Sequence, residues 1–264
     1  MASAIYSKLI YTALMSKSDL KPELNPEHRL IPFETSPLPQ GPWLVFAPHA
    51  DDETYGMAGS LLKATEEGIQ THLVVMTDGA LGGTKEDLVD VRHREVQAAA
   101  RILGINSVDS WQEPDRGLAL SDVLVERIAQ KIREVGAVSV FFPGPLELHP
   151  DHRTTALLVW AAVQKLSSVG FSVDAYSYEI GVQNPVNLFI DITAQRPRKE
   201  RAMTIYASQN DENNYEELVI SLDKGRTFTL PAAVSHAEGF YLYSKEERAT
   251  SLKEVTHNII DLYF

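Results

Sequence analysis

Apolar residues follow two patterns that alternate along the chain between positions 43 and 166. Short apolar runs predict strands at 43–47, 72–77 and 138–142, and residues 107–112 predict a weaker strand. Segments in which apolar residues recur every three or four positions predict helices, one running through Leu61 to Glu67 and others at 91–103, 121–135 and 151–166. This alternation predicts a Rossmann-like α/β fold, with a mostly parallel sheet, right-handed crossovers and helices on both faces.

Three residues mark the ends of these predicted helices. Gly68 and Gly104 each follow the last apolar position of a segment, where glycine readily takes the left-handed conformation that ends a helix. Ser121 precedes another segment, and a serine there caps the first free N–H groups of a helix.

The two ends of the chain are less regular. Residues 17–41 are rich in proline and polar residues and predict an irregular arm. After position 166 we expect strands at 175–180 and 188–192, a helix at 197–208, and a mixed segment without clear period beyond it. With no internal repeat or low-complexity linker, we expect one domain over 1–264, with an N-terminal arm (1–42) and a decorated C-terminal part (about 209–264).

The first sixteen residues predict a short helix with Ile5 and Leu9 on one face. We expect this helix to pack on the domain. A membrane-surface anchor is the alternative, although Lys8 alone gives it a thin polar face. The segment does not resemble a signal peptide, and no apolar run of the chain reaches the length of a membrane span.

Composition limits the classes of function. The 264 residues are 44% apolar and 23% charged, with a net charge of −12, which disfavours nucleic acid as a partner. There is no cysteine, so disulfides, thiolate nucleophiles and cysteine-type zinc sites are excluded and any metal must be held by nitrogen and oxygen. The absence of cysteine fits a reducing compartment, and we expect a cytoplasmic protein.

Two short motifs carry the candidate chemistry: PHADDE at 48–53 and HPDH at 149–152. Each follows a predicted strand, and ligands of open α/β sheets collect at the carboxyl ends of strands. His49, Asp52 and His152 are therefore expected to hold one metal ion, and three protein ligands with one open position are typical of catalytic sites. Two histidines and one carboxylate suit Zn²⁺ and also Fe²⁺.

The remaining polar residues of the motifs suggest acid–base roles around that ion. Asp51 is expected to take a proton from the attacking water, and His149 to steady a developing oxyanion or protonate a leaving amine. Asp151 is expected to support the site by fixing the ring of His149. Taken singly, each of these residues is more often a helix cap, a solvated group or a core histidine, and only their combination indicates a site.

Around these motifs the chain resembles a known family. PHADDE with GMAGSLL, VVMTDGALGG, RHREVQAAARILGI, PDRG and FFPGPLELHPDHR is similar, in order and spacing, to the LmbE-like (PIG-L) family of metal-dependent N-acetylglucosaminyl deacetylases. The resemblance runs from about Trp43 to Thr155 and continues weakly through 199–209 and 237–240.

The resemblance implies an LmbE-like fold and specific roles. It implies His49, Asp52 and His152 as zinc ligands, Asp51 as general base, and His149 as the partner of the tetrahedral intermediate. The family's Arg-x-x-Glu motif matches Arg92 and Glu95, and its loop aspartate matches Asp115. The resemblance implies that these residues contact the substrate or support the site. Arg92 has an alternative interpretation as a surface residue that pairs with Glu95 one helical turn away.

The chain departs from the family pattern at two positions. Ala50 stands where the family usually has proline, and Ala80 stands where the family's TDGE has glutamate. Neither change removes a predicted metal ligand, but the second removes a carboxylate near the expected substrate.

Together, these features predict a zinc-dependent hydrolase that acts on the linear amide C–N bond of an N-acetylated amino sugar, within a glycan, glycolipid or sugar conjugate. The same metal site acting on another amide or ester is the first alternative. A non-catalytic sugar-binding domain and a dinucleotide-binding protein are the others, although the loop GALGG lacks the dinucleotide fingerprint.

Overall fold

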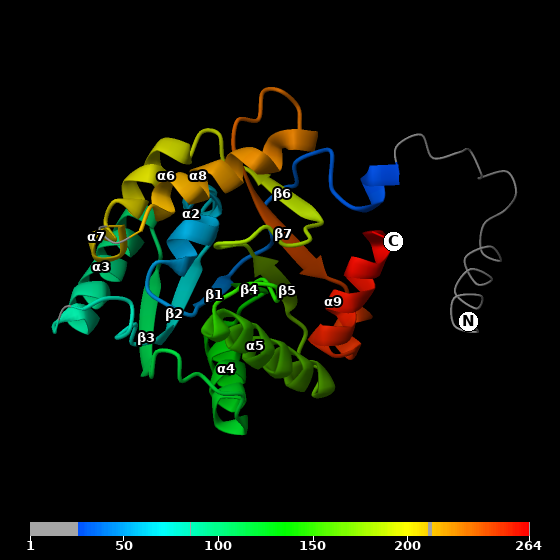
Figure 1. Cartoon of the computed structure of the whole chain (residues 1–264). Coiled ribbons are helices and arrows are strands. Elements are labelled where there is room, and N and C mark those ends of the chain that lie inside the picture. The colour runs from blue at the N-terminus through cyan, green and yellow to red at the C-terminus, as the bar shows by residue number, and fades with distance from the viewer. Residues whose placement is uncertain (1–25, 85, 211–212, 264) are drawn as a thin grey trace, which may run out of the picture.

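The computed structural model describes residues 26–84, 86–210 and 213–263 (Figure 1). The helix expected within residues 1–16 and the first part of the N-terminal arm lie outside the described residues. The chain enters the fold through a short 3₁₀ turn, η1 (Pro26–Arg29), and an extended segment that leads to the first strand.

A parallel sheet forms the centre of the molecule. Its strands are β1 (Trp43–Ala47), β2 (Thr71–Thr77), β3 (Ser107–Glu113), β4 (Ser139–Pro143) and β5 (Asp174–Tyr178), in the order β3-β2-β1-β4-β5. All four pairings between these strands are parallel. The side chains of β1 alternate between two hydrophobic clusters, which explains why this strand is an unbroken apolar run.

Two antiparallel strands extend the sheet beyond β5. β7 (Ala237–Tyr243) pairs with β5 on one side and with β6 (Leu188–Asp191) on the other, which completes the order β3-β2-β1-β4-β5-β7-β6. The sequence did not predict β7, because Glu238 and Gly239 interrupt its apolar pattern. Glu238 is nevertheless buried, since its carboxylate pairs with the ammonium of Lys199 at 2.8 Å.

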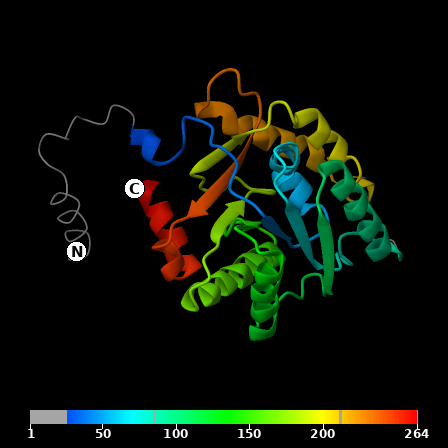
Figure 2. The ribbon, with the colours of Figure 1, turned by 180° about the vertical axis from the view of Figure 1, so that it is seen from behind.

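Helices cover both faces of the sheet, as predicted (Figures 1 and 2). One face carries α4 (Asp122–Val135), α5 (Pro150–Ser168) and α9 (Leu252–Ile260). The other carries α2 (Asp52–Glu66), α3 (Leu88–Leu103), α6 (Arg196–Met203) and α8 (Tyr215–Gly225). Among the described residues, no helix is both long enough and apolar enough to cross a membrane.

Most predicted boundaries hold within two residues, and the helix caps are confirmed. Gly68 and Gly104 have φ angles of 74° and 75°, and Ser121 Oγ accepts a hydrogen bond from the backbone N–H of Leu124 at 3.3 Å. Around the other long elements the chain forms short ones: α7 (Ala207–Asn210), η2 (Arg226–Thr229), η3 (Glu247–Ala249) and η4 (Asp261–Tyr263).

The helix predicted over 197–208 is wrong as one element. α6 ends at Met203, and α7 begins only at Ala207. Tyr206 lies in the break and is fully buried, with its hydroxyl directed at Glu53 of α2. A continuous helix would point this residue elsewhere, so a tertiary contact overrides the local pattern.

α2 bends at Met57, whose φ and ψ of −150° and 22° are not helical. The bend frees the N–H groups of the next turn, and those of Gly59 and Ser60 donate to the Glu238 carboxylate at 2.8 and 2.7 Å. The carboxylate therefore caps the second half of α2 and anchors it to β7.

Candidate active site

The two predicted motifs meet at the carboxyl edge of the sheet. One follows β1 and the other follows β4, and the chain leaves these neighbouring strands in opposite directions across the sheet. Such a reversal of strand order opens a crevice between the loops. A cavity of about 630 Å³ lies there, and it is lined by residues of both motifs.

The three predicted metal ligands converge on one carboxylate oxygen. Asp52 Oδ2 lies 3.2 Å from His49 Nδ1 and 3.3 Å from His152 Nε2, and all three residues are at most 8% exposed. Donors that share an ion tetrahedrally at about 2.1 Å are about 3.4 Å apart, so both distances fit a common ion. The donor set of two imidazoles and one carboxylate also fits a divalent metal.

Among the described residues, two other groups of possible ligands have their atoms within 4.8 Å of one another, and neither includes Asp52. One group is His49, His149 and His152, and the other is His49, Asp115, His149 and Asp151. We favour the set that contains Asp52, because its charged oxygen contacts both ring nitrogens. His149 is less suited as a ligand, since its Nδ1 already accepts a hydrogen bond from the backbone N–H of Asp151 at 3.2 Å.

Two carboxylates support the far side of the His49 ring. Its Nε2 lies 3.4 Å from Asp115 Oδ1 and 3.3 Å from Asp151 Oδ2. A carboxylate on the second nitrogen fixes the proton there and leaves Nδ1 free to bind metal. Burial opposes ionisation of Asp115, but hydrogen bonding and charge from His49 hold the pKa of this carboxyl well below its usual value.

Asp151 contacts a different ring from the one we expected. Its carboxylate accepts a hydrogen bond from the backbone N–H of Arg116 at 2.7 Å and faces His49, while it is 4.0 Å from His149 Nδ1. Asp151 instead holds His149 through its backbone N–H, because His149 is the N-cap residue of α5. Asp115 also braces the cavity wall by accepting a hydrogen bond from the backbone N–H of Leu81 at 2.9 Å.

His149 is neutral in this environment. Burial and the neighbouring His49 and His152 rings lower the pKa of His149 to about 4. Because Nδ1 accepts the helix-capping hydrogen bond, the proton of the neutral ring is on Nε2. His149 therefore presents a hydrogen-bond donor to the cavity that it lines.

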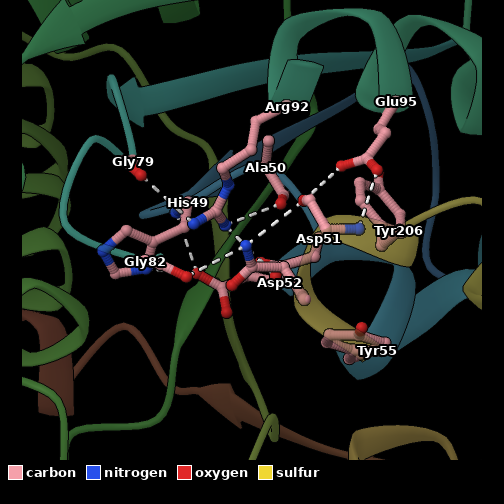
Figure 3. Close-up of polar contacts among 12 residues, drawn as sticks. His49, Ala50, Asp51, Asp52, Tyr55, Gly79, Gly82, Arg92, Glu95 and Tyr206 are labelled. Carbon is pink, nitrogen blue, oxygen red and sulfur yellow. Dashed lines mark hydrogen bonds and ion pairs between the residues drawn. The ribbon is translucent and has the colours of Figure 1, made fainter. Parts of the chain in front are cut away.

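Asp51 is buried beside Arg92 (Figure 3). Arg92 Nη2 lies 3.2 Å from Asp51 Oδ2 and donates to the carbonyl oxygen of Ala50 at 2.9 Å. Burial raises the pKa of Asp51 to about 7, and the charge of Arg92 acts in the opposite direction. A divalent cation bound beside Asp51 lowers this pKa, since positive charge favours the carboxylate.

The alternative that placed Arg92 on the surface with Glu95 is wrong. Arg92 is 4% exposed, and Glu95 instead accepts hydrogen bonds from the backbone N–H and the hydroxyl of Ser208, at 3.0 and 2.6 Å. The contacts of Arg92 with Ala50 and Asp51 favour support of the site over contact with substrate. The exposed Ala80 occupies the position where the family has glutamate, so the missing carboxylate leaves no buried hole.

The glycine-rich loop after β2 makes room for Arg92. A Cβ at Gly79 would lie 2.9 Å from Arg92 Nε, and one at Gly82 would collide with Arg92 Nη1. Gly79 also has a φ of 64°, which favours glycine. The loop GALGG therefore leaves the space in which the Arg92 side chain reaches Asp51.

Glu53, the third acidic residue of the first motif, has a structural role that the sequence did not predict. Glu53 is fully buried; it accepts hydrogen bonds from the Tyr206 hydroxyl at 2.6 Å and from the backbone N–H of Asp51 at 3.3 Å. Asp51 has a φ of 137°, a conformation that non-glycine residues rarely adopt. Glu53 therefore helps to hold strained backbone at the candidate base.

Replacing Tyr206 by phenylalanine is expected to lower the free energy of unfolding by about 1–3 kcal/mol, because the buried Glu53 carboxylate loses a donor. Urea denaturation measures this loss. Tyr241→Phe is the control, since its hydroxyl donates to Glu247 at a partly exposed position, at 2.7 Å. Equal losses in the two variants would contradict a special role for the Tyr206 hydroxyl.

Apolar side chains surround the mouth of the cavity. Leu81, Leu148, Tyr215 and Leu218 line it, and they are 60%, 78%, 37% and 41% exposed. They come from three separate segments: the loop after β2, the loop before α5, and α8. The cavity thus combines a polar, acidic floor with an apolar rim.

The fold and this cluster define the class of the molecule: an α/β protein with a candidate metal centre where its parallel strands end. Residues 44–163, which include both motifs, match the family model described as PIG-L: GlcNAc-PI de-N-acetylase. The chain belongs to the PIG-L (LmbE-like) family. The family membership that the motifs suggested and the predicted fold class are both confirmed.

Curated relatives agree with this assignment. The chain is 30% identical over 63% of its length to a probable N-acetyl-alpha-D-glucosaminyl L-malate deacetylase 2 of Bacillus anthracis, covering 80% of that protein. It is 29% identical over 66% of its length to a diacetylchitobiose deacetylase of Thermococcus kodakarensis, covering 72% of it.

A solved structure shares the fold. The N,N'-diacetylchitobiose deacetylase of Pyrococcus horikoshii aligns with a TM-score of 0.68 and 23% identity. The alignment covers 89% of this chain and 92% of that one, so the likeness includes the strands and helices beyond the family match.

Proposed function

We propose that this protein is a metal-dependent hydrolase that removes the acetyl group from an N-acetylated amino sugar within a glycan, glycolipid or sugar conjugate. One observation carries the proposal: the buried carboxylate of Asp51 lies in the same cavity as the His49, Asp52 and His152 donors. A metal centre with an adjacent base is the equipment of hydrolytic catalysis. The named activities of the two curated relatives support the acetylated amino sugar as substrate.

We propose Zn²⁺ as the metal, held by His49, Asp52 and His152, with Fe²⁺ as the alternative that the same donors accept. When bound, the ion would supply Lewis acidity toward the amide carbonyl and would favour ionisation of water. Asp115 and Asp151 would hold the His49 ring in the tautomer that presents Nδ1.

The protein's own groups account for the proton transfers. Asp51 accepts a proton from the water that attacks the carbonyl carbon, and Arg92 keeps its carboxylate in place. His149 donates a hydrogen bond from Nε2 to the oxygen that gains negative charge. As the C–N bond breaks, the protonated Asp51 carboxyl passes this proton to the leaving nitrogen, and the products are the free amino sugar and acetic acid, which ionises to acetate in solution.

The mixed character of the cavity supports a conjugated sugar as substrate. Polar groups gather on the floor, where the acetamide would be cleaved, and the exposed leucines Leu81, Leu148 and Leu218 stand around the mouth. A cavity of about 630 Å³ is large enough for groups beyond one sugar ring. The rim would contact the part of the substrate attached to the sugar.

Acetate release tests the proposal. We expect zinc-loaded protein to release acetate and free amine in equal amounts from diacetylchitobiose or from an N-acetylglucosamine conjugate, and a chelator to stop the reaction. Release only from simple amides or esters would replace this function by the first alternative. Sugar binding without turnover by metal-loaded protein would favour the non-catalytic domain.

A further inference from the structure

Glu147, two residues before His149, is a buried carboxylate that the proposed mechanism does not use. It lies in the loop between β4 and α5 and is 2% exposed. One of its oxygens accepts a hydrogen bond from the backbone N–H of Ile180 at 2.9 Å, and the other accepts one from Gly181 at 3.3 Å. Ile180 and Gly181 line the cavity, so Glu147 ties its own loop to the opposite wall.

The same carboxylate faces a proposed metal ligand. Glu147 Oε2 lies 3.7 Å from His152 Nδ1, while the other ring nitrogen, Nε2, faces Asp52. Nδ1 is buried and makes no hydrogen bond. Within the described parts of the chain, Glu147 is the one residue whose carboxylate lies within 4.0 Å of that nitrogen.

The chemistry of a metal-binding imidazole gives this contact a meaning. If Nε2 of His152 is to offer its lone pair to a metal, the single proton of the neutral ring must be on Nδ1. A carboxylate beside Nδ1 stabilises that tautomer, and such a partner strengthens metal binding. A small shift would bring Glu147 Oε2 from 3.7 Å to hydrogen-bond distance of His152 Nδ1.

We propose that Glu147 is a positioning residue that fixes the tautomer and orientation of His152 and thereby tightens metal binding. The inference rests on the metal site of the proposed function. It also links that site to the loop after β5, because the two oxygens that hold Ile180 and Gly181 belong to the same carboxylate.

Glu147→Gln separates positioning from mere support of the loop, because the amide keeps the size of the side chain. If the amide oxygen takes the place of Oε1 and accepts the hydrogen bond of Ile180, the NH₂ group takes the place of Oε2, where it faces His152 Nδ1 and opposes the N–H of Gly181. That arrangement stabilises the tautomer with its proton on Nε2, which cannot bind metal. If the amide turns around, its NH₂ group opposes the backbone N–H of Ile180.

The experiment measures the Zn²⁺ dissociation constant of metal-stripped protein by competition with a chromophoric chelator. We expect Glu147→Gln to bind Zn²⁺ about 10–100-fold more weakly than the wild type. Glu147→Asp keeps a carboxylate and is expected to recover part of the affinity, which also serves if the glutamine variant does not fold. The Co²⁺ absorption spectrum reports whether the geometry around the ion changes.

Glu238→Gln is the matched control. Like Glu147, Glu238 is a buried carboxylate that accepts two backbone N–H hydrogen bonds, from Gly59 and Ser60, and faces one side-chain nitrogen, that of Lys199. It touches none of the proposed ligands, so its variant is expected to bind Zn²⁺ as the wild type does.

The outcomes separate the inference from the proposed function. Wild-type affinity in Glu147→Gln, or an equal loss in Glu238→Gln, would overturn the role of Glu147 and leave the proposed function standing. Failure of the wild type itself to bind Zn²⁺ or Fe²⁺ would overturn the proposed metal site, and the inference with it.

Discussion

Replacing Asp51 by asparagine is expected to lower the rate of acetate release by about 10²–10⁴-fold, because an amide cannot accept the proton of the attacking water. The variant should still bind metal, since Asp51 is not among the three proposed ligands. The amide oxygen can still accept a hydrogen bond from Arg92, so the local fold is expected to survive. Turnover at saturating substrate and metal content by elemental analysis measure the two effects.

The pH dependence of the wild type gives the same assignment an independent check. Asp51 acts as a base only when its carboxylate is ionised, so turnover is expected to fall as the pH drops below the pKa of Asp51. That pKa is about 7 without a bound cation and lower with one.

Asp122→Asn, at an exposed helix start, is the control for Asp51→Asn. Near-wild-type turnover in Asp51→Asn would count against the proposed mechanism.

Replacing His152 by alanine is expected to remove the metal. The wild type, purified without chelator, should carry about one equivalent per chain, and the variant should bind at least about 100-fold more weakly, because it loses a direct ligand. His152 Nε2 is one of the two ring nitrogens that contact Asp52 Oδ2. Elemental analysis of both proteins, with thermal denaturation to confirm folding, measures the effect.

The control for this variant is His93→Ala, whose ring is exposed and lies within hydrogen-bond distance of Ser110 Oγ, at 3.3 Å. One equivalent of metal retained in His152→Ala would move the site to the neighbouring group of His49, Asp115, His149 and Asp151. Absence of metal in both proteins, even after incubation with zinc, would mean a degenerate site and favour the sugar-binding interpretation.

The parallel half of the sheet was predictable because burial on both faces leaves a local signature. β1, β2 and β4 are apolar runs or nearly so, and the helices that follow β1, β2 and β3 have glycine or serine at an end. β3 is the half-buried edge strand and carries a weaker signature. β7 and the break after α6 were not predictable. Both depend on buried polar side chains, Glu238 and Tyr206, whose partners are distant in sequence.

The candidate site divides in the same way. The two motifs were enough to predict His49, Asp51, Asp52, His149 and His152 as site residues, because each motif follows one of two neighbouring strands. The residues that hold these side chains in place could not be predicted. Glu53 needs Tyr206, 153 positions away, and Glu147 needs the backbone at Ile180, 33 positions away. The pattern of apolar and polar residues along the chain gives no sign of contacts between residues so far apart.

The contact between Tyr206 and Glu53 has a consequence for how this family is recognised. The family match ends at residue 163, within α5, whereas the hydroxyl that holds Glu53 comes from residue 206. A form of this chain cut after α5 would keep both motifs and would still match the family model. It would lack a donor that steadies the backbone of the candidate base, so a match to both motifs does not by itself establish that the base is supported.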